Sequence, residues 1–128
     1  MTKTEWLDVT EHARIIRAAL KTVWPDLKFQ VRSERYAGGS SITVHMPDGY
    51  RAPEWFYLRL RDAQGARFDG MTDSQSSVRH VLPDGRAVRL GGDYVSTSGG
   101  HGLDNRWLPG SPEQMAQFDK LLPQVKWD

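Results

Sequence analysis

The stretch DVTEHARIIRAALKTVWP, residues 8–25, has the clearest local pattern in this chain. Asp8 with Glu11 three residues later predicts a capping box, in which Asp replaces the usual Ser or Thr. Pro25 ends the pattern, because the residue before a proline is pushed out of the helical region. The stretch predicts an amphipathic helix with an apolar side at helical spacing: Ala13, Ile16, Leu20 and Val23, widened by Ile15 and Ala19.

Two strands are predicted directly after this helix. In LKFQVRS, residues 27–33, Phe29 and Val31 alternate with polar side chains, which is the period of a half-buried strand. SITVHM, residues 41–46, alternates in the same way, with Ile42, Val44 and Met46 facing inward. Two glycines at positions 38 and 39 predict the turn between these strands, and PDG at residues 47–49 predicts the turn that follows them.

The middle segment PEWFYLRLRDAQG, residues 53–65, is ambiguous. Phe56, Leu58 and Leu60 alternate as they would in a strand. Pro53 nevertheless suits the first turn of a helix, and Gly65 suits a helix stop. We therefore predict a helix here.

The remaining segments complete the predicted fold. SVRHVLPDGRAVRLGGDYVSTS, residues 77–98, predicts a meander of short strands, and residues 99–110 predict a loop. Ser111 and Pro112 predict the start of a last helix, whose apolar side is Met115, Phe118, Leu121 and Leu122. Together these elements predict one α+β domain over residues 1–128. Its N-terminal helix packs on a small, mostly antiparallel sheet, in the order α-β-β-α-β-β-β-α.

Composition excludes several kinds of protein. The chain has 128 residues, the size of one domain, and no cysteine, so neither a disulfide framework nor a thiolate metal site is possible. Its 17 Lys and Arg against 16 Asp and Glu leave a formal charge of +1, so an electrostatic partner has to be met by a local patch. Neither a secretory signal nor a membrane-length apolar stretch is present, which predicts a soluble cytoplasmic protein that binds no membrane.

The stretch RFDGMTDS, residues 67–74, places Asp69 and Asp73 on either side of Gly70. With His80, these carboxylates are candidates for a Mg²⁺ or Ca²⁺ site or for acid–base catalysis. The chain has neither the calcium-loop pattern nor a G-x-S-x-G nucleophile motif. The favoured interpretation is structural, with Phe68 in the core and the aspartates bound to backbone groups of a turn. We therefore predict no catalytic residue, no metal and no cofactor.

Seven residues are candidates for one positive, partly aromatic surface: Arg14, Arg17, Lys21, Lys28, Arg32, Arg35 and Tyr36. The first three lie at i, i+3 and i+7 of the predicted helix and share one face. Lys28 and Arg32 share the outward side of the first predicted strand, and Arg35 lies in the turn that follows it. Such a surface suits phosphate and base contacts. The competing interpretation is a solvated face neutralised by Glu11 and Glu34.

Arg106 and Trp107 in the predicted loop form a second candidate surface. An arginine beside a tryptophan has the composition of a binding hot spot. Alternatively, Trp107 folds back and covers the sheet.

Three landmarks make the chain similar to a known class of domains. They are R-S-x-x-Y-x-G-G-x-S-I at residues 32–42, F-D-G-M-x-D at residues 68–73, and L-P-D-G at residues 82–85. With the proline-terminated helix, they resemble a large polyvalent protein-associated domain family over residues 5–98. The landmark residues Phe68, Asp69, Gly70, Asp73, Asp84 and Gly85 are then a structural signature, and residues 99–128 are specific to this chain.

The resemblance implies an α+β fold and a phage- or plasmid-type mobile element, but no reaction. By association with other small proteins of such elements, the first hypothesis is a non-enzymatic accessory protein in the cytoplasm of the host cell. It would bind and block a host protein or ribonucleoprotein complex, as an anti-CRISPR protein does. The second hypothesis is nucleic-acid binding through the basic surface, and the third is a metal-dependent enzyme at Asp69, Asp73 and His80.

Overall fold

The computed structural model describes residues 4–69, 74–99 and 106–125. Along these residues the elements follow in this order: β1 (Glu5–Leu7), α1 (Val9–Val23), β2 (Gln30–Tyr36), β3 (Gly39–His45), β4 (Tyr50–Arg51), α2 (Glu54–Asp62), β5 (Ala66–Asp69), β6 (Ser74–Ser77), β7 (Arg79–Val81), β8 (Ala87–Leu90), β9 (Tyr94–Ser98), β10 (Arg106–Trp107), α3 (Pro112–Leu121) and β11 (Gln124–Val125). The predicted α+β class is confirmed.

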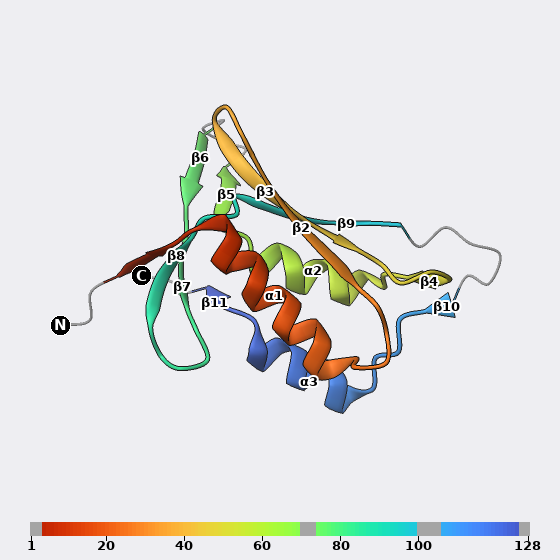
Figure 1. Cartoon of the computed structure of the whole chain (residues 1–128). Coiled ribbons are helices and arrows are strands. Elements are labelled where there is room, and N and C mark those ends of the chain that lie inside the picture. Colours follow the sequence, from red (N-terminus) through yellow and green to blue (C-terminus); the bar gives the residue numbers. More distant parts are fainter. Residues whose placement is uncertain (1–3, 70–73, 100–105, 126–128) are drawn as a thin grey trace.

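A three-stranded sheet of order β2-β3-β9 runs along one side of the molecule (Figure 1). β2 and β3 form an antiparallel hairpin in which Tyr36 lies opposite Gly39. Gly38 closes the turn with a φ of +93°, a conformation that glycine adopts without strain. β9 then lies parallel to β3, with Tyr94 beside Ser41, so this sheet depends on a pairing between segments about fifty residues apart in the sequence.

The other strands form a separate four-stranded sheet and two short ladders. β7 and β8 make the predicted hairpin around Leu82 to Arg86, and β1 and β11 flank it in the order β1-β8-β7-β11. β9 was expected to continue this meander, but it joins β3 instead. The chain passes from β8 to its place beside β3 through Gly92, where an added Cβ would lie 2.6 Å from Nδ1 of His12. A side chain at this position would not fit between the crossing strand and α1.

α1 and α2 lie against the same side of the three-stranded sheet, and α3 packs against α1 (Figure 1). The middle segment, for which a helix was predicted and a strand was the alternative, is confirmed as the helix α2. Phe56 and Leu60 are buried one turn apart on it. Trp24, at the end of α1, is the centre of an aromatic cluster. Its ring centroid lies 5.8 Å from that of Phe56 in α2 and 5.2 Å from that of Phe118 in α3. These ring contacts join the three helices.

The C-terminal segment packs into the same core. The indole Nε1 of Trp24 donates a hydrogen bond to the carbonyl oxygen of Pro109 at 2.8 Å, and the side chains of Phe118 and Leu122 are buried. α3 begins as predicted. Ser111 is its N-cap and exchanges both capping-box hydrogen bonds with Gln114.

The capping box predicted for Asp8 and Glu11 is wrong. Asp8 is the N-cap residue of α1, but its side chain makes no capping hydrogen bond. Its carboxylate instead binds the guanidinium of Arg35, which lowers the pKa of Asp8. Glu11 pairs with Arg14 at 3.1 Å rather than with the backbone. The carboxylate of Asp8 thus forms an ion pair with a residue distant in the sequence and does not cap its own helix.

Two buried histidines hold the C-terminal end of α2. Nε2 of His12 lies 2.8 Å from the carbonyl oxygen of Ala63, and Nε2 of His80 lies 2.8 Å from that of Asp62. Nδ1 of His12 accepts the backbone N–H of Gly92 at 3.0 Å, so the proton of this imidazole is on Nε2 and is donated to Ala63. Burial lowers the pKa of His12 to about 4 and also lowers the pKa of His80.

These histidines predict that the protein loses stability in mild acid. In the unfolded chain a histidine takes up its proton near its ordinary pKa of about 6.5. The folded state resists protonation of His12 down to a pH of about 4. The free energy of unfolding should therefore fall between these two pH values, by about 3 kcal/mol for His12 alone. Urea unfolding measured across this pH range tests the prediction.

The matched variants are His12→Gln and His45→Gln. His12→Gln keeps a donor for Ala63 but has no titrating group, so its stability should depend less on pH than that of the native protein. His45 lies on the outer side of β3 and does not hold α2, so His45→Gln should keep the native pH dependence. An unchanged dependence in His12→Gln would contradict the assignment.

Candidate nucleic-acid interface

The three-stranded sheet has one face that no described residue covers. Val31 lies opposite Val44, and Ile42 lies beside Val95; these side chains are buried against the helices. The alternate residues point to the other side, which we call the open face. Its members stand in three rows across the strands and are all exposed or half-buried: Gln30, His45 and Ser98; Arg32, Thr43 and Ser96; Glu34, Ser41 and Tyr94.

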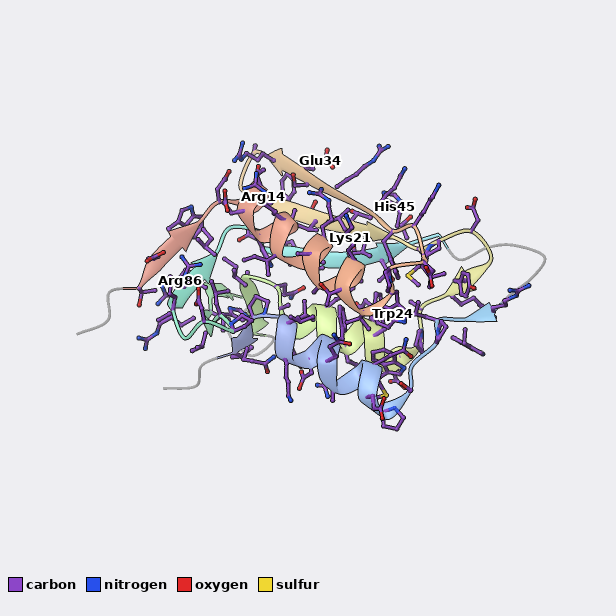
Figure 2. All side chains as sticks on the ribbon, turned by 60° about the horizontal axis from the view of Figure 1, so that its bottom comes forward. Arg14, Lys21, Trp24, Glu34, His45 and Arg86 are labelled. Carbon is purple, nitrogen blue, oxygen red and sulfur yellow. The ribbon has the colours of Figure 1, made fainter. Side chains whose placement is uncertain are left out.

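The open face combines an aromatic ring, hydroxyl groups and a cation. Tyr94 is 40% exposed and stands at one end of the face, and His45 stands at the other. Between them lie serine and threonine hydroxyls, with Glu34 as the single carboxylate of the nine residues. Figure 2 shows Glu34 and His45 along the hairpin and Trp24 among the helices. Hydroxyls, aromatic rings and arginine are the groups by which sheet surfaces bind single-stranded nucleic acid.

Three more cations border this face, and we call Arg17, Lys21 and Lys28 the basic rim. They line one hollow of about 470 Å³ between the end of α1 and the start of β2. Lys28 also lines a neighbouring hollow of about 570 Å³, which contains His45 of the open face. The rim and the face are therefore continuous around the beginning of β2.

Most of these charges are available to a ligand. Within the described residues, Lys21, Lys28 and Arg32 make no ion pair and no hydrogen bond, and all three are exposed. Arg17 donates one hydrogen bond, from its guanidinium to the carbonyl oxygen of Val31 at 2.8 Å, which holds it at the border of β2. A carbonyl partner leaves the charge of Arg17 unneutralised.

The other two predicted cations do not belong to this surface. Arg14 pairs with Glu11 at 3.1 Å. Arg35 was expected in the turn after the first strand, but it lies within β2, where alternation directs its side chain away from the open face and toward Asp8. The predicted six-cation surface is thus a four-cation surface, because acidic residues at the start of α1 neutralise the remaining two.

Two exposed aromatic residues lie away from the rows. Tyr36, 47% exposed, is at the tip of the hairpin, where its ring lies against Gly39. Trp107 is in β10, which pairs with β4 at the other end of the molecule (Figure 1), and the guanidinium of Arg51 lies 5.2 Å from its ring centroid. Trp107 is 61% exposed, so it does not fold back over the sheet. Arg106 beside it is also exposed.

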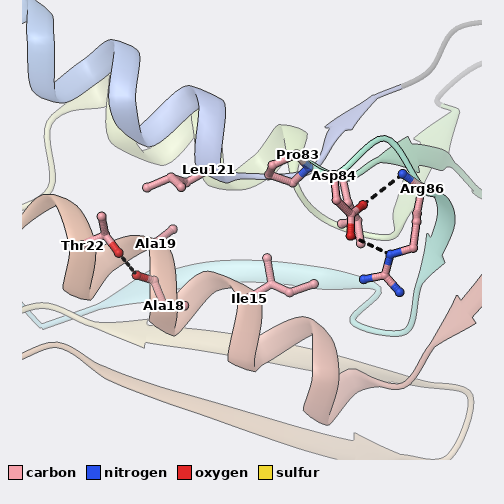
Figure 3. A pocket seen from close by; sticks show the side chains of 9 residues that line it. Ile15, Ala18, Ala19, Thr22, Pro83, Asp84, Arg86 and Leu121 are labelled. Atoms are coloured by element: carbon pink, nitrogen blue, oxygen red, sulfur yellow. Dashed lines mark hydrogen bonds and ion pairs between the residues drawn. The ribbon is translucent and has the colours of Figure 1, made fainter.

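A further hollow of about 290 Å³ lies between α1, α3 and the turn from β7 to β8 (Figure 3). Ile15, Ala19 and Leu121 make its lining largely apolar, and the pair of Asp84 and Arg86 lies at one end. The lining provides few groups for a phosphate. This hollow is therefore separate in place and in chemistry from the basic rim.

The landmark residues have structural positions where they are described. Asp84 accepts hydrogen bonds from N and Nε of Arg86, at 3.0 and 2.8 Å, and the backbone N–H of Arg86 is the main cause of its lowered pKa. Gly85 has a φ of +91°. Phe68 and Asp69 lie in β5, whose backbone pairs with β6. Gly70 and Asp73 are outside the described residues, as are the side chains of Phe68 and Asp69.

The proposed base His80 is held by the backbone. Its Nε2 lies 2.8 Å from the oxygen of Asp62, and its Nδ1 lies 3.3 Å from the oxygen of Val78. The ring is fully buried, and within the described part of the chain no group of three potential ligands could hold a metal ion. His80 therefore has a structural role in this geometry.

Tyr94 was missing from the sequence-based candidates. Its segment DYVSTS alternates like any half-buried strand, and nothing local shows that Tyr94 lies beside Ser41. Only the parallel pairing of β9 with β3 brings it onto the same face as Arg32.

Comparison with known proteins gives one family match. A sequence model described as large polyvalent protein associated domain 29 matches residues 7–102, three quarters of the chain. This confirms the resemblance seen in the three landmarks. Neither the curated proteins nor the solved structures contain a significant match. Among the described residues, no helix is long and apolar enough to cross a membrane.

Proposed function

The chain belongs to the large polyvalent protein associated domain 29 family, a class of mobile-element-associated domains, and we propose that it is a non-enzymatic domain that binds single-stranded nucleic acid. Bases would lie on the open face, and the basic rim would bind the phosphates. The observation that supports the proposal is the position of four cations, unpaired with any acid in the described structure, around an uncovered sheet face with an exposed tyrosine.

The shape of the surface favours single strands over duplexes. Three strands present a face about 10 Å across, which fits a row of unstacked bases. Base stacking needs an exposed ring, and Tyr94 provides one at one end of the face. The net charge of +1 is compatible with this function, because four unneutralised cations gather at one border while Asp8 and Glu11 neutralise Arg35 and Arg14.

Salt dependence tests the role of the cations. Four phosphate contacts to a single strand give a slope of about −3 for the logarithm of the association constant against the logarithm of salt concentration. Arg32→Gln should reduce the steepness of this slope by about 0.7, which is the contribution of one phosphate contact to a single strand. Fluorescence anisotropy with a labelled oligouridylate or oligothymidylate measures both slopes.

The control is Arg86→Gln, because Arg86 pairs with Asp84 in the turn between β7 and β8, away from the open face, and should contribute nothing to the slope. Binding that is independent of salt, or an equal change in both variants, would rule out the proposed interface.

Stacking gives an independent prediction. Tyr94→Ala should weaken oligonucleotide binding by about 1–3 kcal/mol, which is typical of one lost base–ring contact. Tyr57→Ala is the matched control, since Tyr57 is also exposed but lies on α2, away from the open face. The proposal fails if the two variants bind equally well, as measured by titration at a fixed, low salt concentration.

A second proposed function is the blocking of a host macromolecular complex, for example as an anti-CRISPR protein. Exposed Trp107, with Arg51 against its ring and Arg106 beside it, favours a protein contact at the end of the molecule formed by β4 and β10. The family setting on mobile elements agrees with such a role. A host protein or ribonucleoprotein would be the partner.

Affinity purification from host lysate tests this second function. The native protein should recover a partner at near-stoichiometric level, and Trp107→Ala should lose it, because an exposed tryptophan at a hot spot contributes at least about 2 kcal/mol. Trp6→Ala is the matched control, since Trp6 is equally exposed but lies in β1 of the other sheet. Recovery of the same partner by Trp107→Ala would exclude this surface.

A further inference from the structure

The backbone of β2 has one side that faces away from the sheet. In β3, the carbonyl of Ser40 accepts a hydrogen bond from Asp93 at 3.1 Å, and the N–H of Met46 donates to Ser98 at 2.8 Å. The even-numbered residues of β3 thus face β9, and the odd-numbered residues face β2. In the register of the hairpin, the odd-numbered residues of β3 pair with the even-numbered residues of β2. The N–H and C=O groups of Val31, Ser33 and Arg35 therefore point outward.

Only part of this outward side is occupied. The carbonyl oxygen of Val31 accepts the hydrogen bond from Arg17. Within the described residues, the outward backbone groups of Ser33 and Arg35 have no partner. The other border of the sheet differs, because the N–H of Val95 in β9 donates to Oε1 of Gln64 at 3.3 Å. The β2 edge is therefore the side on which a further strand can pair.

Unneutralised cations lie along the part of this edge near Val31. Arg17 reaches the edge from α1, Lys21 is one turn further along the same helix, and Arg32 projects from β2. Arg17 and Lys21 are about 6 Å apart along the helix axis. Alternate residues of an added strand are about 6.7 Å apart, which is close enough for two successive same-side carboxylates to meet these two cations.

We propose that the β2 edge binds an extended acidic segment of a partner protein as a fourth strand of the sheet. Backbone hydrogen bonds to Ser33 and Arg35 hold the segment, and acidic residues at alternate positions face Arg17 and Lys21. This surface is distinct from the open face but shares the basic rim with it. An acidic segment and a nucleic acid therefore compete for the same cations.

The probe is an acetylated ten-residue peptide of alternating Glu and Thr, tested against the full chain in low salt. Two further probes carry backbone N-methyl groups, one on every Glu and one on every Thr. A strand pairs through the N–H groups of alternate residues, so only one methylated probe should lose affinity, by at least about ten-fold. The backbone amide signals of Ser33 and Arg35 should shift on binding of the unmodified peptide.

Charge attraction without strand pairing predicts a different result. All three peptides have the same charge, so equal binding by the three, or equal loss by both methylated probes, would overturn the proposal. Preferential binding of an oligonucleotide with no binding of any peptide would do the same.

Ser33→Pro tests the same edge from the protein side. It removes an outward N–H and leaves the hairpin hydrogen bonds intact, so it should abolish peptide binding and keep oligonucleotide binding. Thr97→Pro is the matched control, because it removes an outward N–H from β9, and it should keep both. Peptide binding that survives in folded Ser33→Pro would contradict the proposal. If the native protein binds the peptide but no oligonucleotide, only the proposed function is contradicted.

Discussion

In the described structure α1 and α2 pack on one side of the sheet β2-β3-β9 and α3 packs on α1, and the contact that joins the three helices is the aromatic cluster around Trp24. The ring of Trp24 meets Phe56 of α2 and Phe118 of α3, and its indole N–H binds the segment before α3. Because this cluster uses all three helices on one face, none is left to cover the other. The open face is thus a consequence of how the core is built.

Local ion pairs decide which cations this arrangement leaves available. Asp8 and Glu11 at the start of α1 neutralise Arg35 and Arg14. Further along α1 and at the start of β2, no acidic residue pairs with Lys21 or Lys28 within the described part of the chain. A chain with a formal charge of only +1 therefore has a positive border beside a sheet face that itself carries one cation, Arg32, and one carboxylate, Glu34.

Features set by neighbouring residues could be predicted from the sequence. The hairpin of β2 and β3, the turn at Gly85 and the Ser111 cap of α3 follow from glycine, proline and capping preferences within a few residues. The family was also recognisable from short landmarks.

Features set by distant residues could not be predicted. The pairing of β9 with β3 depends on the close approach of Gly92 to His12, and the neutralisation of Arg35 depends on its ion pair with Asp8, 27 residues away in the sequence. No local period encodes either contact. The candidate interface shows the same division. Lys28 and Arg32 were predictable as an outward strand face, whereas Tyr94 and the rows of hydroxyls required the tertiary structure.

The central claim is that nucleic acid binds across β2, β3 and β9 and not elsewhere on the molecule. The most direct measurement is a nuclear magnetic resonance titration of the isotope-labelled protein with a short oligouridylate or oligothymidylate. The account predicts that signal changes concentrate at the open face and the basic rim, strongest near Arg32, Thr43 and Tyr94. Changes that concentrate instead around Trp107, or in the apolar hollow between α1 and α3, would contradict it.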